Sequence, residues 1–283
     1  MVTSRAFPGL ASALLVVALA ALPAGAQDQT QETAQDPARG QAAEILRNRG
    51  CPDCDLRLIT LRGLQMAGVN LAQATLREAD LKEIVLAGAS LAGADLRRAE
   101  LERADLSGAD LTGASMRGVD MEKATLPGAL LIEADLRDSD LNETRMENAD
   151  FTDADLRNAS FIRAALMRAT FAGAKMDGID LERADASGAS FAGARLVQAD
   201  LDRVIARGAS FRDADMTGAR LSSADLSGAD LSGADLTDAL LRNTRLTGAD
   251  LSTARGLSQE RIINACGDAS TRLPGGITLK PCS

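Results

Sequence analysis

Catalytic chemistry that depends on histidine is excluded for this chain, because its 283 residues include no His. Ser-His-Asp and Cys-His nucleophilic catalysis both need an imidazole base, so neither can operate here. The commonest metal ligand is missing for the same reason. The groups that remain capable of chemistry are four cysteines and two regular series of charged side chains.

The cysteines form two close pairs in the sequence, Cys51 with Cys54 and Cys266 with Cys282. An even number of cysteines is typical of disulfide-bonded proteins from oxidising compartments. A Cys-x-x-Cys motif can also be redox-active, but no βαβ pattern surrounds this one. Four cysteines can bind zinc if the fold brings them together.

The basic series consists of arginines that recur at every twentieth position, namely Arg57, Arg77, Arg97, Arg117, Arg137 and Arg157. One interpretation is a contact surface for an anion or a macromolecule. The other is a self-neutralised ladder, because each Arg has an acid two residues before it or three residues after it. The pairs expected are Arg57 with Asp55, Arg77 with Asp80, Arg97 with Asp95 and Glu100, Arg117 with Asp120, Arg137 with Asp135 and Asp140, and Arg157 with Asp155. Exposed pairs contribute roughly 0–1 kcal/mol each, and the ladder is the favoured interpretation.

The acidic series consists of Asp80, Glu100, Asp120, Asp140, Asp180 and Asp200. Carboxylate oxygens suit calcium, and paired carboxylates can act as acid and base. However, Arg103 and Lys123 lie beside this series and no Gly-rich calcium loop is present. We therefore expect no catalytic residues, no metal and no cofactor.

A five-residue period positions all these side chains. From Leu56 to Leu251 every fifth residue is large and apolar, except Ala186 and Ala206. The residue two before it is usually Ala, the residue between them is often Asp, and the residue two after it is often Gly. The repeating unit is therefore Ala-Asp-Leu-x-Gly, and such a repeat must be interpreted before any single motif.

Neither regular secondary structure buries every fifth side chain on one face. Five residues of α-helix rotate by about 500°, and five residues of straight strand end on the opposite side. A chain that turns a right angle every five residues does bury them: Ala and Leu point inward, Asp points outward, and Gly tolerates the unusual φ of the corner. Four such corners close one coil, so equivalent positions recur at every twentieth residue.

The aromatic residues support this coil independently. Phe151, Phe171, Phe191 and Phe211 also recur at every twentieth position and would stack in one interior column. Phe191 and Phe211 each follow an alanine by five residues, so we expect their rings to fill the space that Ala186 and Ala206 leave. About ten coils at strand spacing predict a rod roughly 48 Å long.

The runs Ala104–Gly113 and Ala224–Leu236 resemble the pentapeptide-repeat family. The resemblance extends over most of the chain and implies an all-β fold, a right-handed quadrilateral β-helix. The handedness comes from the resemblance and not from the period. The best understood members are cytoplasmic, acidic mimics of DNA that bind a type II topoisomerase, and most members have no assigned function.

Both open ends of such a coil need a cap, because they expose a strand edge and an apolar surface. A helix of about 37–48 would present Ala42, Ile45 and Leu46 on one side. A second helix of about 259–265 would offer Ile262 and Ile263.

The rod geometry also restricts the cysteines. Bridged Cα atoms lie within about 7 Å, so a rod of this length permits only Cys51–Cys54 and Cys266–Cys282 within one chain. Cys54 occupies an inward alanine position, so a small unbridged core residue stays an alternative there.

The first 26 residues are typical of a signal peptide. A single charge, Arg5, precedes an apolar stretch that ends in the small-x-small site Ala24-Gly25-Ala26. An uncleaved anchor is the alternative, but Pro8 and Pro23 interrupt the apolar run. The predicted organisation is a signal peptide (1–26), a disordered linker (27–36), a capping helix with the first cysteine pair (37–55), the β-helix (56–255), and a capping helix with a Cys-bracketed tail (256–283).

The sequence therefore predicts a non-enzymatic exported solenoid, periplasmic or secreted, that acts as a rigid protein-interaction or structural element. Its partner would be an unidentified envelope protein or other macromolecule. Nucleic acid is disfavoured by the net charge of −9, and no membrane span is expected after processing. A homodimer through a capped end would also fit. The alternatives are a DNA-mimicking inhibitor of a type II topoisomerase, opposed by the signal peptide, and an envelope carbohydrate-active enzyme, opposed by the lack of Trp and Tyr.

Overall fold

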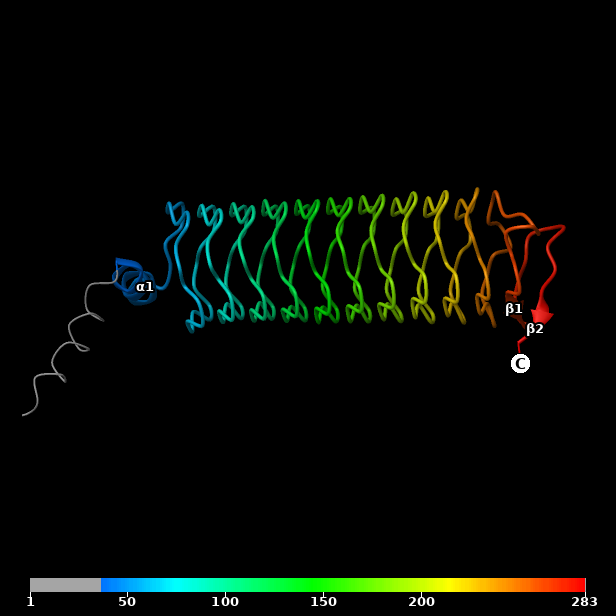
Figure 1. Cartoon of the computed structure of the whole chain (residues 1–283), viewed down its shortest axis with the longest axis horizontal. Helices are drawn as coiled ribbons and strands as arrows, with labels where there is room; N and C mark the ends of the chain where they lie inside the picture. The colour runs from blue at the N-terminus through cyan, green and yellow to red at the C-terminus, as the bar shows by residue number, and fades with distance from the viewer. Residues whose placement is uncertain (1–36, 283) are drawn as a thin grey trace, which may run out of the picture.

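The chain winds into a straight rod in the computed structural model, which describes residues 37–282 (Figure 1). The predicted signal peptide (1–26) and linker (27–36) lie outside the described residues. Three elements are regular within the described residues: helix α1 (Pro37–Arg47), strand β1 (Cys266–Gly267) and strand β2 (Lys280–Pro281). Between α1 and β1 the chain forms coils that are joined by single bridges.

Equivalent residues of successive coils pair in parallel along the rod, from Gly50 with Asn70 to Asp235 with Arg255. The amide of Leu111 donates to the carbonyl of Leu130 at 2.7 Å, and the same pattern recurs from coil to coil. Each coil thus supplies hydrogen-bond partners for the backbone N–H and C=O groups of its neighbours. The short extended segments are therefore stable although none of them forms a long strand. The pairing agrees with the coil length inferred from the Phe and Arg series.

Each corner from Asp53 to Gly248 places one residue in the left-handed region. At Gly113 φ is +64°, and at Glu133, one coil further on, φ is +57°. Glycine is the residue that tolerates this conformation without steric cost, which explains its frequency two residues after the inward Leu. The corners without glycine carry a backbone cost of roughly 1–2 kcal/mol each.

The same Gly-to-Ala change should therefore have opposite effects at two sites. A Cβ at Gly113 would meet no atom within 4 Å, so Gly113→Ala tests the backbone alone and should cost about 1 kcal/mol. Gly40→Ala lies in the open on α1 and should stabilise by up to about 1 kcal/mol, since alanine is the better helix former. Chemical denaturation measures both, and equal effects would contradict the left-handed corner.

The Asp between the inward Ala and Leu of the repeat has a structural role, which its outward position alone does not predict. Asp110 accepts the backbone N–H of Thr112 at 3.0 Å, and Asp150 accepts that of Thr152 at 2.9 Å. An Asp side chain that bonds the backbone two residues ahead stabilises a turn. The aspartates therefore hold the corners while they also charge the surface.

The interior is filled by the inward Ala, Leu, Met and Phe side chains, which are buried along the rod. Phe151, Phe171, Phe191 and Phe211 stack with centroids 4.8–5.0 Å apart and nearly parallel rings, as predicted. Phe161 meets the column edge-on, 6.0 Å from Phe151. The rod therefore has a packed core rather than a channel.

Polar residues replace alanine at three buried positions, and their hydroxyls donate to backbone carbonyls. Thr144 donates to Leu141 at 2.6 Å and Ser139 to Met116 at 2.9 Å, while Thr244 donates to Leu221 at 2.8 Å. Because each hydroxyl donates to a carbonyl, the polar side chains at these positions bury no hydroxyl without a hydrogen bond.

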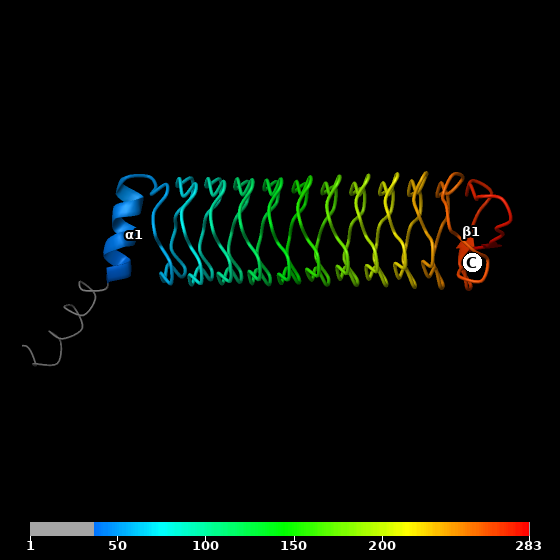
Figure 2. The ribbon, with the colours of Figure 1, turned by 90° about the horizontal axis from the view of Figure 1, so that it is seen from above.

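Helix α1 lies across the N-terminal end of the rod (Figure 2). Ala42 and Ile45 are buried there, whereas Leu46 is 43% exposed. The buried side of the helix is therefore narrower than the predicted side, which included Leu46. Leu46 is the last apolar residue before the helix ends at Arg47, and its position one residue beyond Ile45 turns it away from the coil.

The predicted C-terminal helix over 259–265 is wrong. Residues 259–261 form a turn, and this turn and the segment after it supply carbonyls to the last coil. The amide of Leu241 donates to the carbonyl of Arg261 at 3.0 Å and that of Leu246 to the carbonyl of Cys266 at 2.8 Å. A helix over 259–265 would bond the Arg261 carbonyl internally, so the unpaired amides of the coil edge favour a non-helical chain instead.

Both predicted cysteine pairs lie at disulfide distance. The Cα atoms are 5.5 Å apart in Cys51–Cys54 and 4.8 Å apart in Cys266–Cys282. The second pair holds β2 parallel to β1, with Cys266 opposite Lys280. Within residues 37–282, no helix is long and apolar enough to cross a membrane.

Candidate functional site: the arginine edge

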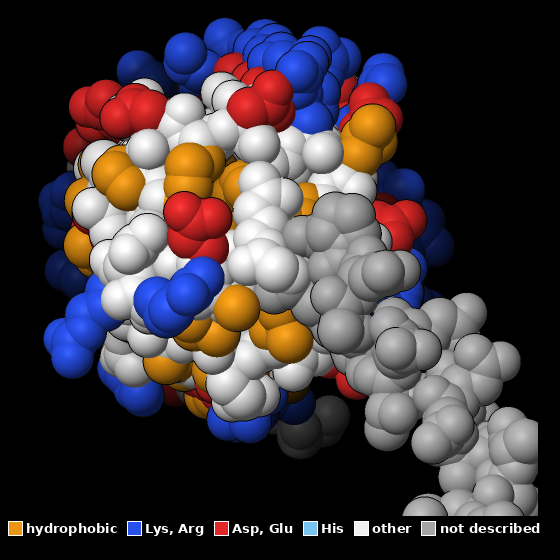
Figure 3. Space-filling view, turned by 90° about the vertical axis from the view of Figure 1, so that its left-hand side faces the viewer, with side chains coloured by type: hydrophobic (Ala, Val, Ile, Leu, Met, Phe, Trp, Pro, Cys, Tyr) orange, Lys and Arg blue, Asp and Glu red, His pale blue; other side chains and the backbone are white. Residues whose placement is uncertain are grey.

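The six arginines of the basic series occupy one corner of successive coils, which we call the Arg edge. Seen along the rod, Lys and Arg side chains are densest at the top of the view, with acids beside them, and others lie around the remaining sides (Figure 3). The side chains of the Arg edge range from 35% to 59% exposed, so solvent and ligands can reach them.

Four of these arginines fold back onto the aspartate two residues earlier. The pairs are Arg57–Asp55, Arg97–Asp95, Arg137–Asp135 and Arg157–Asp155, each with Nε and Nη2 on the two carboxylate oxygens at 2.6–2.8 Å. Two parallel N–H donors on one carboxylate give the strongest geometry for an exposed ion pair. For these four the predicted ladder is present.

The other two arginines do not form the predicted pairs with Asp80 and Asp120. Arg77 reaches Asp95 at 2.9 Å, and Arg117 reaches Asp138 at 2.9 Å. The position two residues earlier holds Thr75 or Ser115 instead of Asp, so neither arginine has an acid on its own turn.

An acid three residues after an arginine of the Arg edge lies on the next wall of the coil. Two of these acids pair there with the Arg or Lys at the corner of the preceding coil. Asp80 pairs with Arg62 at 3.1 Å and Glu100 pairs with Lys82 at 3.1 Å. The expected second pairs, Arg97 with Glu100 and Arg137 with Asp140, are likewise not among the ion pairs of the described residues.

Asp95 consequently serves two guanidinium groups. Hydrogen bonds from Arg97, with burial opposing them and a further bond from Arg77, hold the pKa of Asp95 well below its usual range. The Nε of Arg77 is buried and has no hydrogen-bond partner in the part of the chain that the structure describes. One carboxylate between two arginines leaves this stretch of the edge with more positive charge than the stretches on either side.

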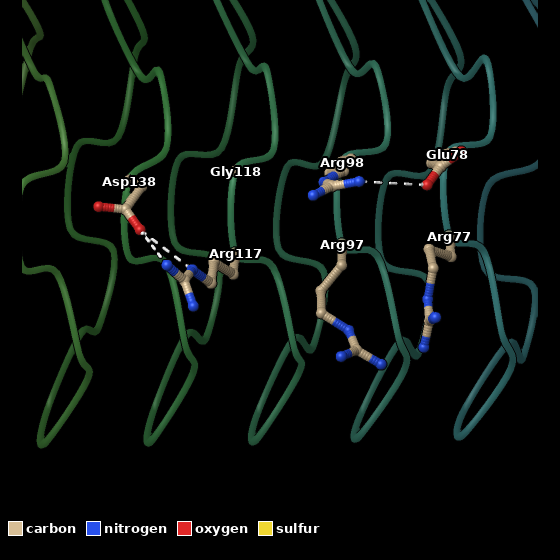
Figure 4. A pocket seen from close by; sticks show the side chains of 7 residues that line it. All are labelled: Arg77, Glu78, Arg97, Arg98, Arg117, Gly118 and Asp138. Carbon is tan, nitrogen blue, oxygen red and sulfur yellow. Dashed lines mark hydrogen bonds and ion pairs between the residues drawn. The ribbon is translucent and has the colours of Figure 1, made fainter.

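A groove of about 540 Å³ opens at this stretch (Figure 4), lined by Arg77, Glu78, Arg97, Arg98, Arg117, Gly118 and Asp138. Arg98 is 77% exposed and approaches Glu78 only to 3.7 Å. Figure 4 shows Arg77 and Arg97 extending to one side, while Arg117 turns toward Asp138. Guanidinium groups in such a groove can bind anions, but they supply no nucleophile or general base.

The acidic series takes no part in this groove. Burial raises the pKa of Asp120, and the nearby Glu102 and Asp140 carboxylates raise it further against the backbone N–H of Glu122. Within the described part of the chain, no group of three or more acids or cysteines is placed to hold a metal ion.

Two Asp-to-Asn changes should respond to pH with opposite signs. The lowered pKa of Asp95 means that its ionised form stabilises the fold above about pH 4, its unfolded value, so Asp95→Asn should cost about 1–2 kcal/mol at pH 7. The raised pKa of Asp120 means that its ionisation opposes folding, so Asp120→Asn should raise the melting temperature at pH 7. Both differences should shrink toward pH 3. Thermal melts over pH 3–7 test this, and a pH-independent effect of Asp95→Asn would refute it.

Sequence reasoning missed the groove residues Glu78, Arg98 and Asp138. They occupy the left-handed corner position, where only the frequency of glycine was considered. The signal was nevertheless present, because Arg98 doubles Arg97, and Thr75 and Ser115 interrupt the aspartates before the Arg series.

These observations define a class of protein: a four-sided solenoid with a packed interior, whose accessible chemistry lies on its walls and corners. The model of the family described as pentapeptide repeats matches in eight copies, with matched stretches between residues 54 and 255. The chain therefore belongs to the pentapeptide-repeat family, whose members fold as right-handed quadrilateral β-helices and are generally non-enzymatic structural or interaction proteins.

Several solved structures are similar to this chain. HetL, a pentapeptide-repeat protein involved in heterocyst differentiation regulation in the cyanobacterium Nostoc sp., is 32% identical, with 80% of this chain and 91% of that chain covered and a TM-score of 0.37. A pentapeptide-repeat protein of the Arabidopsis thaliana thylakoid lumen is 39% identical over 34% of this chain and 63% of that one, with a TM-score of 0.26. Full-length QnrB1, a plasmid-mediated fluoroquinolone resistance protein, is 20% identical over 65% and 92%, with a TM-score of 0.33. No curated protein matches.

Proposed function

We propose that this protein is an exported, non-enzymatic rod that binds a macromolecule of the cell envelope along its Arg edge. The rod would consist of ten coils, capped by α1 at one end and by the Cys-bracketed tail at the other. The packed interior supports binding to a surface, because small ligands usually need a concave and partly apolar site. The groove at Arg77, Arg98 and Arg117 is the observation that carries the proposal.

The contact would lie in the middle of the edge rather than along its whole length. Arg57, Arg137 and Arg157 are each held by the aspartate of their own turn and stabilise the corner. Arg98 has only a long contact with Glu78, and Arg117 reaches an acid on another coil. The second set is therefore free to exchange its partners for those of a bound macromolecule.

Two matched double variants separate contact from structure. Arg98 and Arg117 replaced by Ser should abolish capture of an envelope protein in a pull-down, while the melting temperature stays nearly unchanged. Arg57 and Arg157 replaced by Ser should keep capture and lower the melting temperature by a few degrees. If both variants capture the same partner as the wild type, the contact lies elsewhere, with the tail of residues 266–283 as the next candidate.

Export has a separate test. Protein purified from its native host should have an intact mass that begins at Gln27, as the Ala24-Gly25-Ala26 site predicts. Full-length chain recovered with the membrane fraction would instead support an uncleaved anchor.

A protein that mimics DNA needs a continuous acidic surface. The ion pairs on the walls of this rod argue against such a surface. Corner arginines neutralise acids on the next coil, as in Arg207–Asp225 at 2.7 Å and Arg212–Asp230 at 2.5 Å. We therefore expect no inhibition in a gyrase supercoiling assay.

A further inference from the structure

The arginines of the Arg edge pair with the aspartates of this corner in two ways. An arginine at this corner can use the acid two residues earlier on its own turn, or the equivalent acid on the following coil, as Arg77 does. Asp95 shows that both can be used at once, because it accepts Arg97 at 2.6 Å and Arg77 at 2.9 Å. The Asp95 carboxylate therefore lies between two guanidinium groups of neighbouring coils.

Ser115 occupies the corresponding position between Arg97 and Arg117. The bridge between Asp95 and Ser115 shows that the two residues are neighbours on adjacent coils, and Ser115 is half-buried in the same way. Within the described residues no carboxylate joins Arg97 to Arg117. Arg97 is bonded to its own Asp95, and Arg117 points away to Asp138.

We propose that a phosphate group, free or as a phosphate ester, binds over Ser115 between Arg97 and Arg117. There it would take the role that Asp95 has between Arg77 and Arg97. The inference deepens the proposed function, since it names the chemistry that the middle of the Arg edge recognises.

The charge of the site favours phosphate over a carboxylate. A carboxylate would replace Asp138 on Arg117 with a ligand of equal charge, which gains little. A phosphate carries about −1.5 to −2 charges and at least three acceptor oxygens, so it can engage both guanidinium groups and the Ser115 hydroxyl together. Asp138 would not be left unpaired, because Asn158 Nδ2 also donates to it at 3.1 Å.

The surroundings admit such a ligand. The groove of about 540 Å³ runs beside Arg97 and Arg117 and leaves room for the organic part of an ester. Arg98 is 77% exposed at its rim and adds a third guanidinium. The buried Nε of Arg77, which has no partner, shows that the internal acids of this stretch do not satisfy its donors.

The test compares two serine-to-aspartate variants that add the same charge at the same position of the five-residue repeat, on different walls of the rod. Ser115→Asp would place a carboxylate between Arg97 and Arg117 and fill the site from within. Ser190→Asp is the control, because Ala172 and Ala192 stand where the arginines would be. Calorimetric titration at low salt would use inorganic phosphate, glycerol 3-phosphate and acetate on the full mature chain.

We expect inorganic phosphate to bind the wild type and Ser190→Asp, and to bind Ser115→Asp about tenfold more weakly or not at all. Ser115→Asp should melt no lower than the wild type, which shows that the variant folds. Equal binding of glycerol 3-phosphate would assign the site to esters, and binding of inorganic phosphate alone to the free ion.

Three results would overturn the inference: no binding of phosphate to the wild type at millimolar concentration, binding to Ser115→Asp as tight as to the wild type, or acetate binding as tightly as phosphate. Because the titration needs no partner, its failure is separate from failure of the proposed function. A rod that still captures an envelope protein but does not bind phosphate uses the same edge for a different chemistry.

Discussion

Replacing Phe191 with Ala is expected to lower the free energy of unfolding by about 3–5 kcal/mol, the largest effect of any single change considered for this chain. Its ring is stacked between Phe171 at 5.0 Å and Phe211 at 4.8 Å and is fully buried. Truncation removes both stacked contacts and leaves a cavity, which the expected compensation for the small Ala186 would enlarge. Denaturant unfolding of the purified rod measures the loss.

Phe171→Ala is the matched control, because Phe171 also lies in the middle of the stack, between Phe151 and Phe191. The inward residue five positions earlier is Leu166 instead of Ala. If the Phe191 ring compensates for Ala186, Phe191→Ala should cost more than Phe171→Ala. A larger loss for Phe171→Ala would disprove the compensation.

Cys282→Ser should destabilise the C-terminal end by about 3 kcal/mol, since the bridge closes a loop of about 15 residues. The tail depends on this bridge for its attachment, because β2 is only two residues long and Cys282 donates its amide to Gly267 at 3.0 Å. Thermal unfolding with and without a reductant is the measurement.

The wild type should melt lower with reductant, and Cys282→Ser should melt at that lower temperature in both conditions. Cys51→Ser should have a smaller effect, because Cys51 and Cys54 are only three positions apart and close almost no loop. A wild type that melts identically with and without reductant would show that the Cys266–Cys282 bridge does not support the cap.

The coil was predictable because one repeated rule determines it. A period of five fits neither helix nor strand, so the right-angled coil, its inward Leu and the Phe column followed from spacing alone. Phe161 shows the limit of that reasoning. Its edge-on contact with Phe151 depends on the width of the interior, and no periodicity reports a width.

The ends were less predictable, because there the coil competes with local propensity. Ile262 and Ile263 suit the apolar side of a helix over 259–265, yet the open amides of Leu241 and Leu246 bind a turn and the chain that follows it. The structure of the cap depends on which backbone amides of the last coil lack a partner. The sequence of residues 259–265 alone does not contain that information.

The Arg edge was predicted as a set and misjudged in its pairs. Acids three residues later were treated as equivalent to acids two residues earlier, although a corner separates them. Thr75 and Ser115 are more informative than any arginine, because they stand where the other turns have an Asp. At these two turns the ladder is incomplete, and guanidinium groups remain for a partner.

Site-specific photo-crosslinking in the native host tests the central claim most directly. A photoreactive residue would be placed at Arg98, on the Arg edge, and in a second strain at Arg168, which is exposed on the corner half a coil away. The proposed contact predicts a discrete adduct with an envelope macromolecule from position 98 and none from position 168. Adducts of equal yield from both positions, or from position 168 alone, would contradict a contact at the Arg edge.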